Sequence, residues 1–231
     1  MSRLFTLVLS MALLVGVVAE RPAAERHDDT VTLQVAVSRV AVVSDSYTTG
    51  SNEGGEGDRG WATRAWQSLA ARGLPVMADV AAEGGAGYAT RGNRGSVFED
   101  LAARAIKPDD DLVVFFGSRN DERVGAARLT VMVYGLMQMA RRIAPRAKFL
   151  VIGPAWPTAD PPPAILRIRD TLSYQADLAK ARFVDPIAER WFVDKPELIG
   201  RDGVHPTDAG HVYMADKIAP LIGDQLAGLR H

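Results

Sequence analysis

The residues best suited to chemistry are a serine and a histidine with a carboxylate nearby. Residues 42–50 read VVSDSYTTG, so Asp45 and Ser46 directly follow an apolar run. A serine hydroxyl becomes a useful nucleophile only when a base removes its proton. Asp202 and His205 stand in the sequence DGVHP, and an imidazole held by a carboxylate is such a base. These residue types suit acyl transfer.

Two further segments offer hydrogen-bond donors. Residues 83–88 read EGGAGY, and residues 117–121 read GSRND. In acyl transfer a negative charge develops on the carbonyl oxygen. A glycine turn can point a backbone N–H at that oxygen, and an asparagine side chain can add a second donor. The two segments therefore fit an oxyanion hole.

Each of these segments follows an apolar run or precedes a helix, in a chain that alternates the two. The expected strands are residues 35–43, 74–82, 111–116, 147–153 and 182–185, and the expected helices are 61–72, 97–105, 124–144, 161–180 and a last one capped by Thr207. This alternation favours a parallel sheet between two helix layers. Ligands bind such sheets beyond the carboxyl ends of the strands, where we expect the four segments to meet. Residues 48–60 and 155–163, with Trp156, are expected loops around the pocket.

The four segments resemble the motif blocks of the SGNH (GDSL-type) hydrolases, from about Val40 to His211. That resemblance implies an α/β fold with three α/β/α layers and a five-stranded parallel, flavodoxin-like sheet. It implies a carboxylic ester hydrolase that needs no cofactor, with Ser46, Asp202 and His205 as catalytic residues. His205 and His211 stand six positions apart and no second pair accompanies them, so the sequence predicts no metal site.

The resemblance also assigns the oxyanion hole. It implies donors from the backbone of Ser46, the backbone of Gly85 and the side chain of Asn120, with Gly87 as an alternative register for the glycine. The sequence departs from the family pattern at Ser44 and Ser118, which stand where the family has glycine. Serine suits a positive φ poorly, so these two positions put the level of activity in question.

Other readings of the sequence concern the same fold or a different ligand. A non-catalytic glycan- or lipid-binding module and an acyltransferase to a sugar hydroxyl are alternatives that the motifs leave open. Residues 55–60 read GEGDRG, a formal GxGxxG. They lie about ten residues beyond the first strand, too far for the tight turn that cradles a dinucleotide.

The composition and the N-terminal residues limit the possible partners and the cellular location of the protein. Of the 231 residues, 27 are Lys or Arg and 28 are Asp or Glu, and no basic patch indicates nucleic acid. Residues 1–19 predict a signal peptide, with a retained N-terminal anchor as the alternative; residues 20–34 predict a polar spacer and 35–231 the hydrolase domain. We therefore expect a secreted or cell-envelope protein that acts on a small-molecule, glycan or lipid ester. There is no cysteine, so disulfides are excluded.

Overall fold

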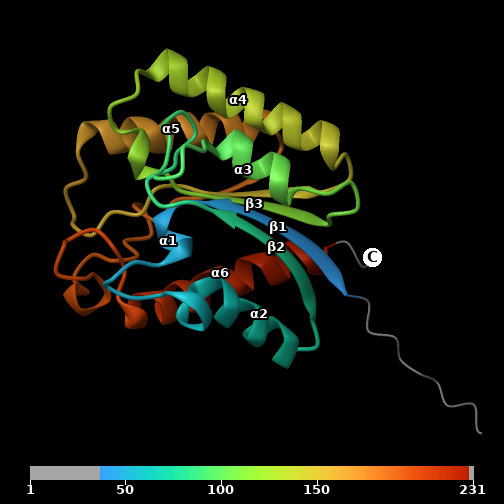
Figure 1. Cartoon of the computed structure of the whole chain (residues 1–231), viewed down its shortest axis with the longest axis horizontal. Helices are drawn as coiled ribbons and strands as arrows, with labels where there is room; N and C mark the ends of the chain where they lie inside the picture. The colour runs from blue at the N-terminus through green and yellow to red at the C-terminus, as the bar shows by residue number, and fades with distance from the viewer. Residues whose placement is uncertain (1–36, 229–231) are drawn as a thin grey trace, which may run out of the picture. The chain divides into compact units, whose positions relative to one another are not determined.

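The computed structural model describes residues 37–228, and the predicted signal peptide and spacer lie outside these residues. Five parallel strands form one sheet in the order β2-β1-β3-β4-β5 (Figure 1). The strands are β1 (Ser38–Ser44), β2 (Val76–Ala82), β3 (Leu112–Phe116), β4 (Lys148–Ile152) and β5 (Arg182–Val184). The five-stranded parallel sheet predicted from the alternation is confirmed.

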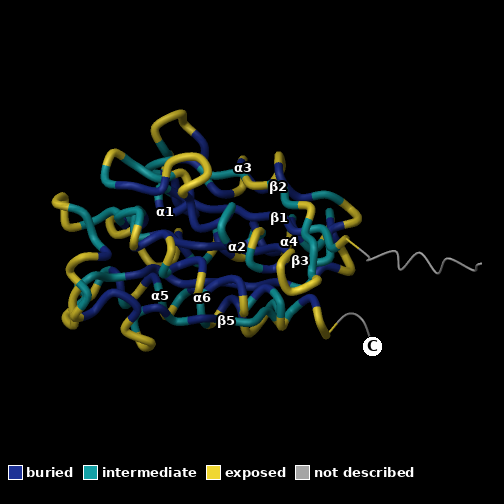
Figure 2. Tube along the Cα trace, turned by 90° about the horizontal axis from the view of Figure 1, so that it is seen from below, coloured by how far each residue is buried: buried dark blue, intermediate teal, exposed yellow. Residues whose placement is uncertain are grey.

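The central strands are apolar because helices cover both faces of the sheet. All five residues of β3, LVVFF, are buried, as are the last five residues of β1. A strand that is covered on both faces shows no alternation of polar and apolar residues. In Figure 2 the trace of β3 and most of the trace of β1 are coloured as buried.

Two helix layers enclose the sheet (Figure 1). On one face lie α2 (Trp61–Ala71) and α6 (Asp208–Ala227), and on the other lie α3 (Phe98–Ala105), α4 (Ala126–Ile143) and α5 (Pro163–Leu178). Each layer has its own apolar core, with Trp61 and Ile218 in the first and Phe98 and Leu136 in the second. The predicted three-layer fold is therefore confirmed.

The chain order and the strand order together define where the site lies. The chain moves from β1 out to the edge strand β2 and then returns to β3 on the other side of β1. Where the direction of winding reverses, the loops after two neighbouring strands diverge and leave a crevice. Ser46 follows β1 and Asn120 follows β3, so both lie at this crevice.

Several element boundaries differ from the prediction. The expected loop 48–60 begins within a one-turn helix, α1 (Ser46–Thr49), and contains a short 3-10 turn, η1 (Gly57–Arg59). One turn is too short for a hydrophobic period to show in a sequence. Thr207 does cap α6, since its Oγ1 accepts the Gly210 N–H at 3.1 Å. Within residues 37–228 there is no helix with the length and apolarity to cross a membrane.

Candidate active site

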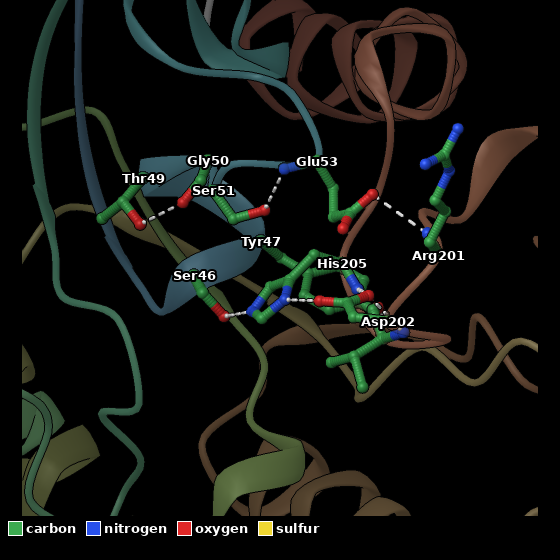
Figure 3. Close-up of polar contacts among 10 residues, drawn as sticks. Ser46, Tyr47, Thr49, Gly50, Ser51, Glu53, Arg201, Asp202 and His205 are labelled. Carbon is green, nitrogen blue, oxygen red and sulfur yellow. Dashed lines mark hydrogen bonds and ion pairs between the residues drawn. The ribbon is translucent and has the colours of Figure 1, made fainter.

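Ser46 is the first residue of α1 and stands at the carboxyl end of β1. The buried Asp45 caps this short helix, because its Oδ1 accepts the Tyr47 N–H at 2.9 Å. The chain therefore turns sharply out of the sheet and presents the Ser46 hydroxyl toward the loop that precedes α6 (Figure 3). The cap explains why a polar residue occupies a buried position between two serines.

Ser46, His205 and Asp202 form a continuous hydrogen-bonded chain (Figure 3). Ser46 Oγ lies 3.0 Å from His205 Nε2, and His205 Nδ1 lies 2.6 Å from Asp202 Oδ2. A carboxylate at Nδ1 requires a proton on that nitrogen, which leaves Nε2 free to accept the serine proton. The geometry is that of a nucleophile, a base and a residue that orients the base.

Asp202 also shapes the loop that carries the histidine. Its Oδ1 accepts the backbone N–H groups of Val204 at 2.8 Å and His205 at 2.9 Å. Burial alone would raise the pKa of the Asp202 carboxyl, but the hydrogen bonds from the His205 ring and from the two amides outweigh it and lower that pKa. Asp202 is therefore ionised at neutral pH and able to stabilise an imidazolium.

The loop is fastened to the rest of the site from two sides. The Tyr47 hydroxyl donates to the Val204 carbonyl at 2.7 Å. From the loop after α1, Glu53 Oε2 accepts the Arg201 N–H at 3.0 Å (Figure 3). Residues that are far apart in the sequence thus hold the histidine loop next to Ser46.

Gly85 lies in a tight turn at the other wall of the cavity. Its φ is +77°, a conformation that glycine adopts without strain. Neither the Gly85 N–H nor the Ser46 N–H donates a hydrogen bond to another residue of the range 37–228. Gly87, the alternative register, donates its N–H to the Thr90 carbonyl at 2.9 Å. Gly85 is therefore the glycine whose amide remains available to a ligand.

Asn120 lies at the same cavity, in the 3-10 turn η2 (Arg119–Asp121). Its Nδ2 donates to the Ala86 carbonyl at 2.8 Å and faces Asp45 Oδ2 at 3.4 Å. The second contact is long for a hydrogen bond. An oxygen in the cavity would therefore compete with Asp45 for one amide hydrogen.

Sequence reasoning missed the role of Asp121. Its buried carboxylate accepts three consecutive backbone N–H groups, from Tyr88 at 2.8 Å, Ala89 at 3.0 Å and Thr90 at 2.9 Å. These bonds fix the loop that carries Gly85. A Cβ on Gly87 would lie 2.6 Å from the Asp121 carboxylate oxygens, so Gly87 is required for this packing. The position of Asp121 directly after Asn120 was the feature of the sequence that could have indicated this role.

The two departures from glycine do not force serine into a positive φ. Ser44 lies in β1, where its Oγ accepts the Thr48 hydroxyl at 2.7 Å. Ser118 has a φ of −128°, and the positive φ of this segment, +117°, falls on Gly117. The Ser118 hydroxyl donates to the Ala86 carbonyl at 3.0 Å and accepts the Asn120 N–H at 3.0 Å. Neither serine therefore occupies the positive φ that the sequence comparison put in question.

A cavity of about 610 Å³ opens over these groups. Its lining combines the predicted site residues with the loop after α1 and with two cations: Ser46, Gly85, Asn120, His205, Asn52, Arg94 and Arg119. The expected loop 48–60 thus shapes the pocket. Trp156 from the second expected loop contributes by stacking on Arg119, at 4.4 Å from guanidinium carbon to ring centroid.

The GxGxxG segment takes no part in this cavity. Gly55 donates its N–H to Asp208 Oδ1 at 2.8 Å and packs against the His211 ring. These residues hold the loop before α2 against the start of α6 instead of forming a strand-to-helix turn after β1. Their glycines serve close packing.

The chain is also similar to known proteins. Residues 45–213 match the family described as GDSL-like Lipase/Acylhydrolase family. The protein named GDSL lipase Rv0518, from Mycobacterium tuberculosis (strain ATCC 25618 / H37Rv), is 57% identical over 231 residues, which are 99% of this chain and 100% of that protein.

Solved structures share the fold. A lipase/acylhydrolase from Enterococcus faecalis superposes with a TM-score of 0.63 at 16% identity, over 80% of this chain and 95% of that chain. A family two carbohydrate esterase from Clostridium thermocellum, in complex with cellohexaose, reaches a TM-score of 0.65 at 16% identity, over 82% of this chain and 65% of that chain. At these identities the likeness concerns the fold.

Proposed function

Because the chain belongs to the GDSL-like lipase/acylhydrolase family and is thus a carboxylic ester hydrolase, we propose that it works through Ser46, His205 and Asp202. Ser46 is the nucleophile, His205 the general base and then the general acid, and Asp202 the residue that orients His205. The observation that carries this assignment is the chain of contacts at 3.0 Å and 2.6 Å that joins the three side chains.

The reaction proceeds in two acyl-transfer steps. Ser46 Oγ attacks the ester carbonyl carbon while its proton moves to His205 Nε2. The tetrahedral intermediate collapses as His205 returns that proton to the departing alkoxide, which leaves an acyl group on Ser46. A water molecule, deprotonated by His205, then attacks the acyl carbon, and the acid leaves as the proton returns to Ser46 Oγ.

The negative charge on the substrate oxygen is stabilised by three donors. We assign the Ser46 N–H and the Gly85 N–H, which are not engaged elsewhere in residues 37–228, and one Nδ2 hydrogen of Asn120. Each such donor typically contributes about 10²–10³ in rate. Asn120 acts by exchanging its long contact with Asp45 for the oxyanion.

The proposed setting is outside the cytoplasm. Residues 1–19 would direct export as a signal peptide and residues 20–34 would form a spacer before the hydrolase domain. The proposed substrates are lipid, glycan or small acyl esters at the cell envelope or beyond.

A fluorophosphonate probe tests the assignment, because it reacts with an activated serine whatever the natural ester. We expect one adduct, located at Ser46 by peptide mass spectrometry and lost in Ser46→Ala and His205→Ala. Ser51 lies in the same cavity without an imidazole partner, so Ser51→Ala should label like the wild type. Labelling that persists in a folded Ser46→Ala protein would refute the assignment.

A further inference from the structure

Arg119 is the charged residue of the active-site cavity that lacks an ion pair within residues 37–228. Arg94 Nε lies 3.8 Å from the buried carboxylate of Glu83, and His205 is paired with Asp202. No carboxylate forms a salt bridge with Arg119 in the described part of the chain, although Arg119 lines the same cavity as Ser46.

The Arg119 guanidinium is nevertheless held in place. It stacks on the Trp156 ring, 4.4 Å from the centroid, and lines a small cavity together with Tyr47. Its Nη1 is buried and has no hydrogen-bond partner among residues 37–228. A buried donor without a partner is costly, and a guanidinium carries five N–H groups. Nη1 itself is closed off, but Nε and Nη2 also donate no hydrogen bond within residues 37–228 and are not buried, so these two nitrogens are the ones that an anion in the cavity can reach.

Asp45 is the nearest alternative partner, since it lines a small cavity together with Arg119. However, the Asp45 carboxylate accepts the Tyr47 N–H on Oδ1 and faces Asn120 Nδ2 with Oδ2. No ion pair joins Asp45 to Arg119. Residues 37–228 thus offer Arg119 no carboxylate as an ion-pair partner.

We propose that Arg119 binds a carboxylate or phosphate group of the substrate and makes this hydrolase selective for anionic esters. This inference rests on the proposed function, because it places the anion in the cavity that holds Ser46. The planar fork of a guanidinium matches both anions with two parallel hydrogen bonds. Arg119 directly precedes Asn120 in η2, so an anion bound there lies close to the reacting ester.

Two matched substrate pairs measure this selectivity and distinguish the sources of the anion. Monoethyl succinate against diethyl succinate tests a carboxylate on the acyl side. 1-Butyrylglycerol 3-phosphate against 1-butyrylglycerol tests a phosphate on the alcohol side. Release of acid in a pH-stat gives kcat/KM for each ester with wild type, Arg119→Gln, Arg119→Lys and the control Arg123→Gln. Arg123 is exposed and four residues along the chain, so its variant matches the change in net charge.

In at least one pair we expect the wild type to prefer the anionic ester and Arg119→Gln to lose about 10–100-fold of that preference, the usual range for a charge-assisted hydrogen bond. Arg119→Lys should retain part of it, and Arg123→Gln should retain all of it. A urea-unfolding midpoint close to that of the wild type shows that Arg119→Gln is folded, independently of its rate on the neutral esters.

If Arg119→Gln loses the same factor in kcat/KM on the anionic and the neutral esters, the inference is overturned. The same holds if the ratio of kcat/KM between anionic and neutral ester is unchanged in both pairs. Ser46→Ala separates the two proposals. If Ser46→Ala is inactive while Arg119→Gln keeps the ratio, the anion site is wrong and the catalytic assignment stands.

Discussion

Replacing the buried His211 with asparagine is expected to make the protein more resistant to acid. His211 lies in α6, and its Nδ1 accepts the Trp61 N–H at 3.2 Å. Burial lowers the pKa of the His211 ring from 6.5 to about 4, with the Arg64 charge acting in the same direction and Asp208 against it. An asparagine Oδ1 can still accept the Trp61 N–H, but it cannot take up a proton.

The direction of the pH effect on stability follows from the protonation of His211 in the folded and unfolded states. Between pH 6.5 and pH 4 the unfolded chain protonates this histidine and the folded chain does not, so the free energy of unfolding falls as the pH is lowered. From pH 7 to pH 4.5 the loss amounts to about 2 kcal/mol. The free energy of unfolding of His211→Asn lacks this loss. Relative to the wild type it should therefore rise by about 2 kcal/mol from pH 7 to pH 4.5, whatever the difference between the two proteins at pH 7.

Asp45 supplies a control of opposite sign. Burial raises the pKa of its carboxyl from 3.8 to about 6, so the folded protein binds the extra proton and loses stability as the pH rises through this window. The change from pH 4.5 to pH 7 is again about 2 kcal/mol. The free energy of unfolding of Asp45→Asn should therefore increase relative to that of the wild type as the pH rises. In the wild type the two contributions nearly cancel.

Urea unfolding followed by tryptophan fluorescence, at half-unit steps from pH 4.5 to pH 7, measures these differences at constant m-value. The two variants should show slopes of opposite sign relative to the wild type. If the His211→Asn curve runs parallel to the wild-type curve, the ring is not held neutral by burial and the reasoning fails.

Three further changes test other parts of the structure. Asp202→Asn should lower kcat by about 10³–10⁴, because an amide no longer favours the tautomer with a free Nε2; steady-state kinetics with KM near the wild-type value would support this, and a normal kcat would contradict it. Gly117→Ala should destabilise the fold by about 2 kcal/mol, because φ is +117° and the new Cβ would lie 2.7 Å from Asp45 Oδ2; an unchanged melting temperature would disprove it. Ser44→Ala should cost about 1 kcal/mol through the lost contact with Thr48 while kcat stays unchanged, and a drop in kcat would show that Ser44 matters to catalysis.

Much of the architecture was predictable because it depends on local patterns. Unbroken apolar runs such as LVVFF predict strands that are buried on both faces, and their alternation with amphipathic stretches predicts a parallel sheet. The predicted site residues stand directly after such runs or before the last helix. A single-turn helix such as α1 escaped prediction, because four residues carry no period.

The sequence by itself determined which groups are available to chemistry. These are the serines after the first apolar run, with Ser46 singled out by the family resemblance, one histidine with a carboxylate three residues before it, and the glycine and asparagine segments. Only the tertiary structure decided which atoms meet. It brings Ser46 Oγ within 3.0 Å of His205 Nε2 across 159 positions of sequence, and it leaves the Gly85 amide open while that of Gly87 is used. It also places Arg119 in the lining of the cavity without an ion-pair partner among residues 37–228. Distances and unpaired donors arise from the packing of distant segments, which no local pattern encodes.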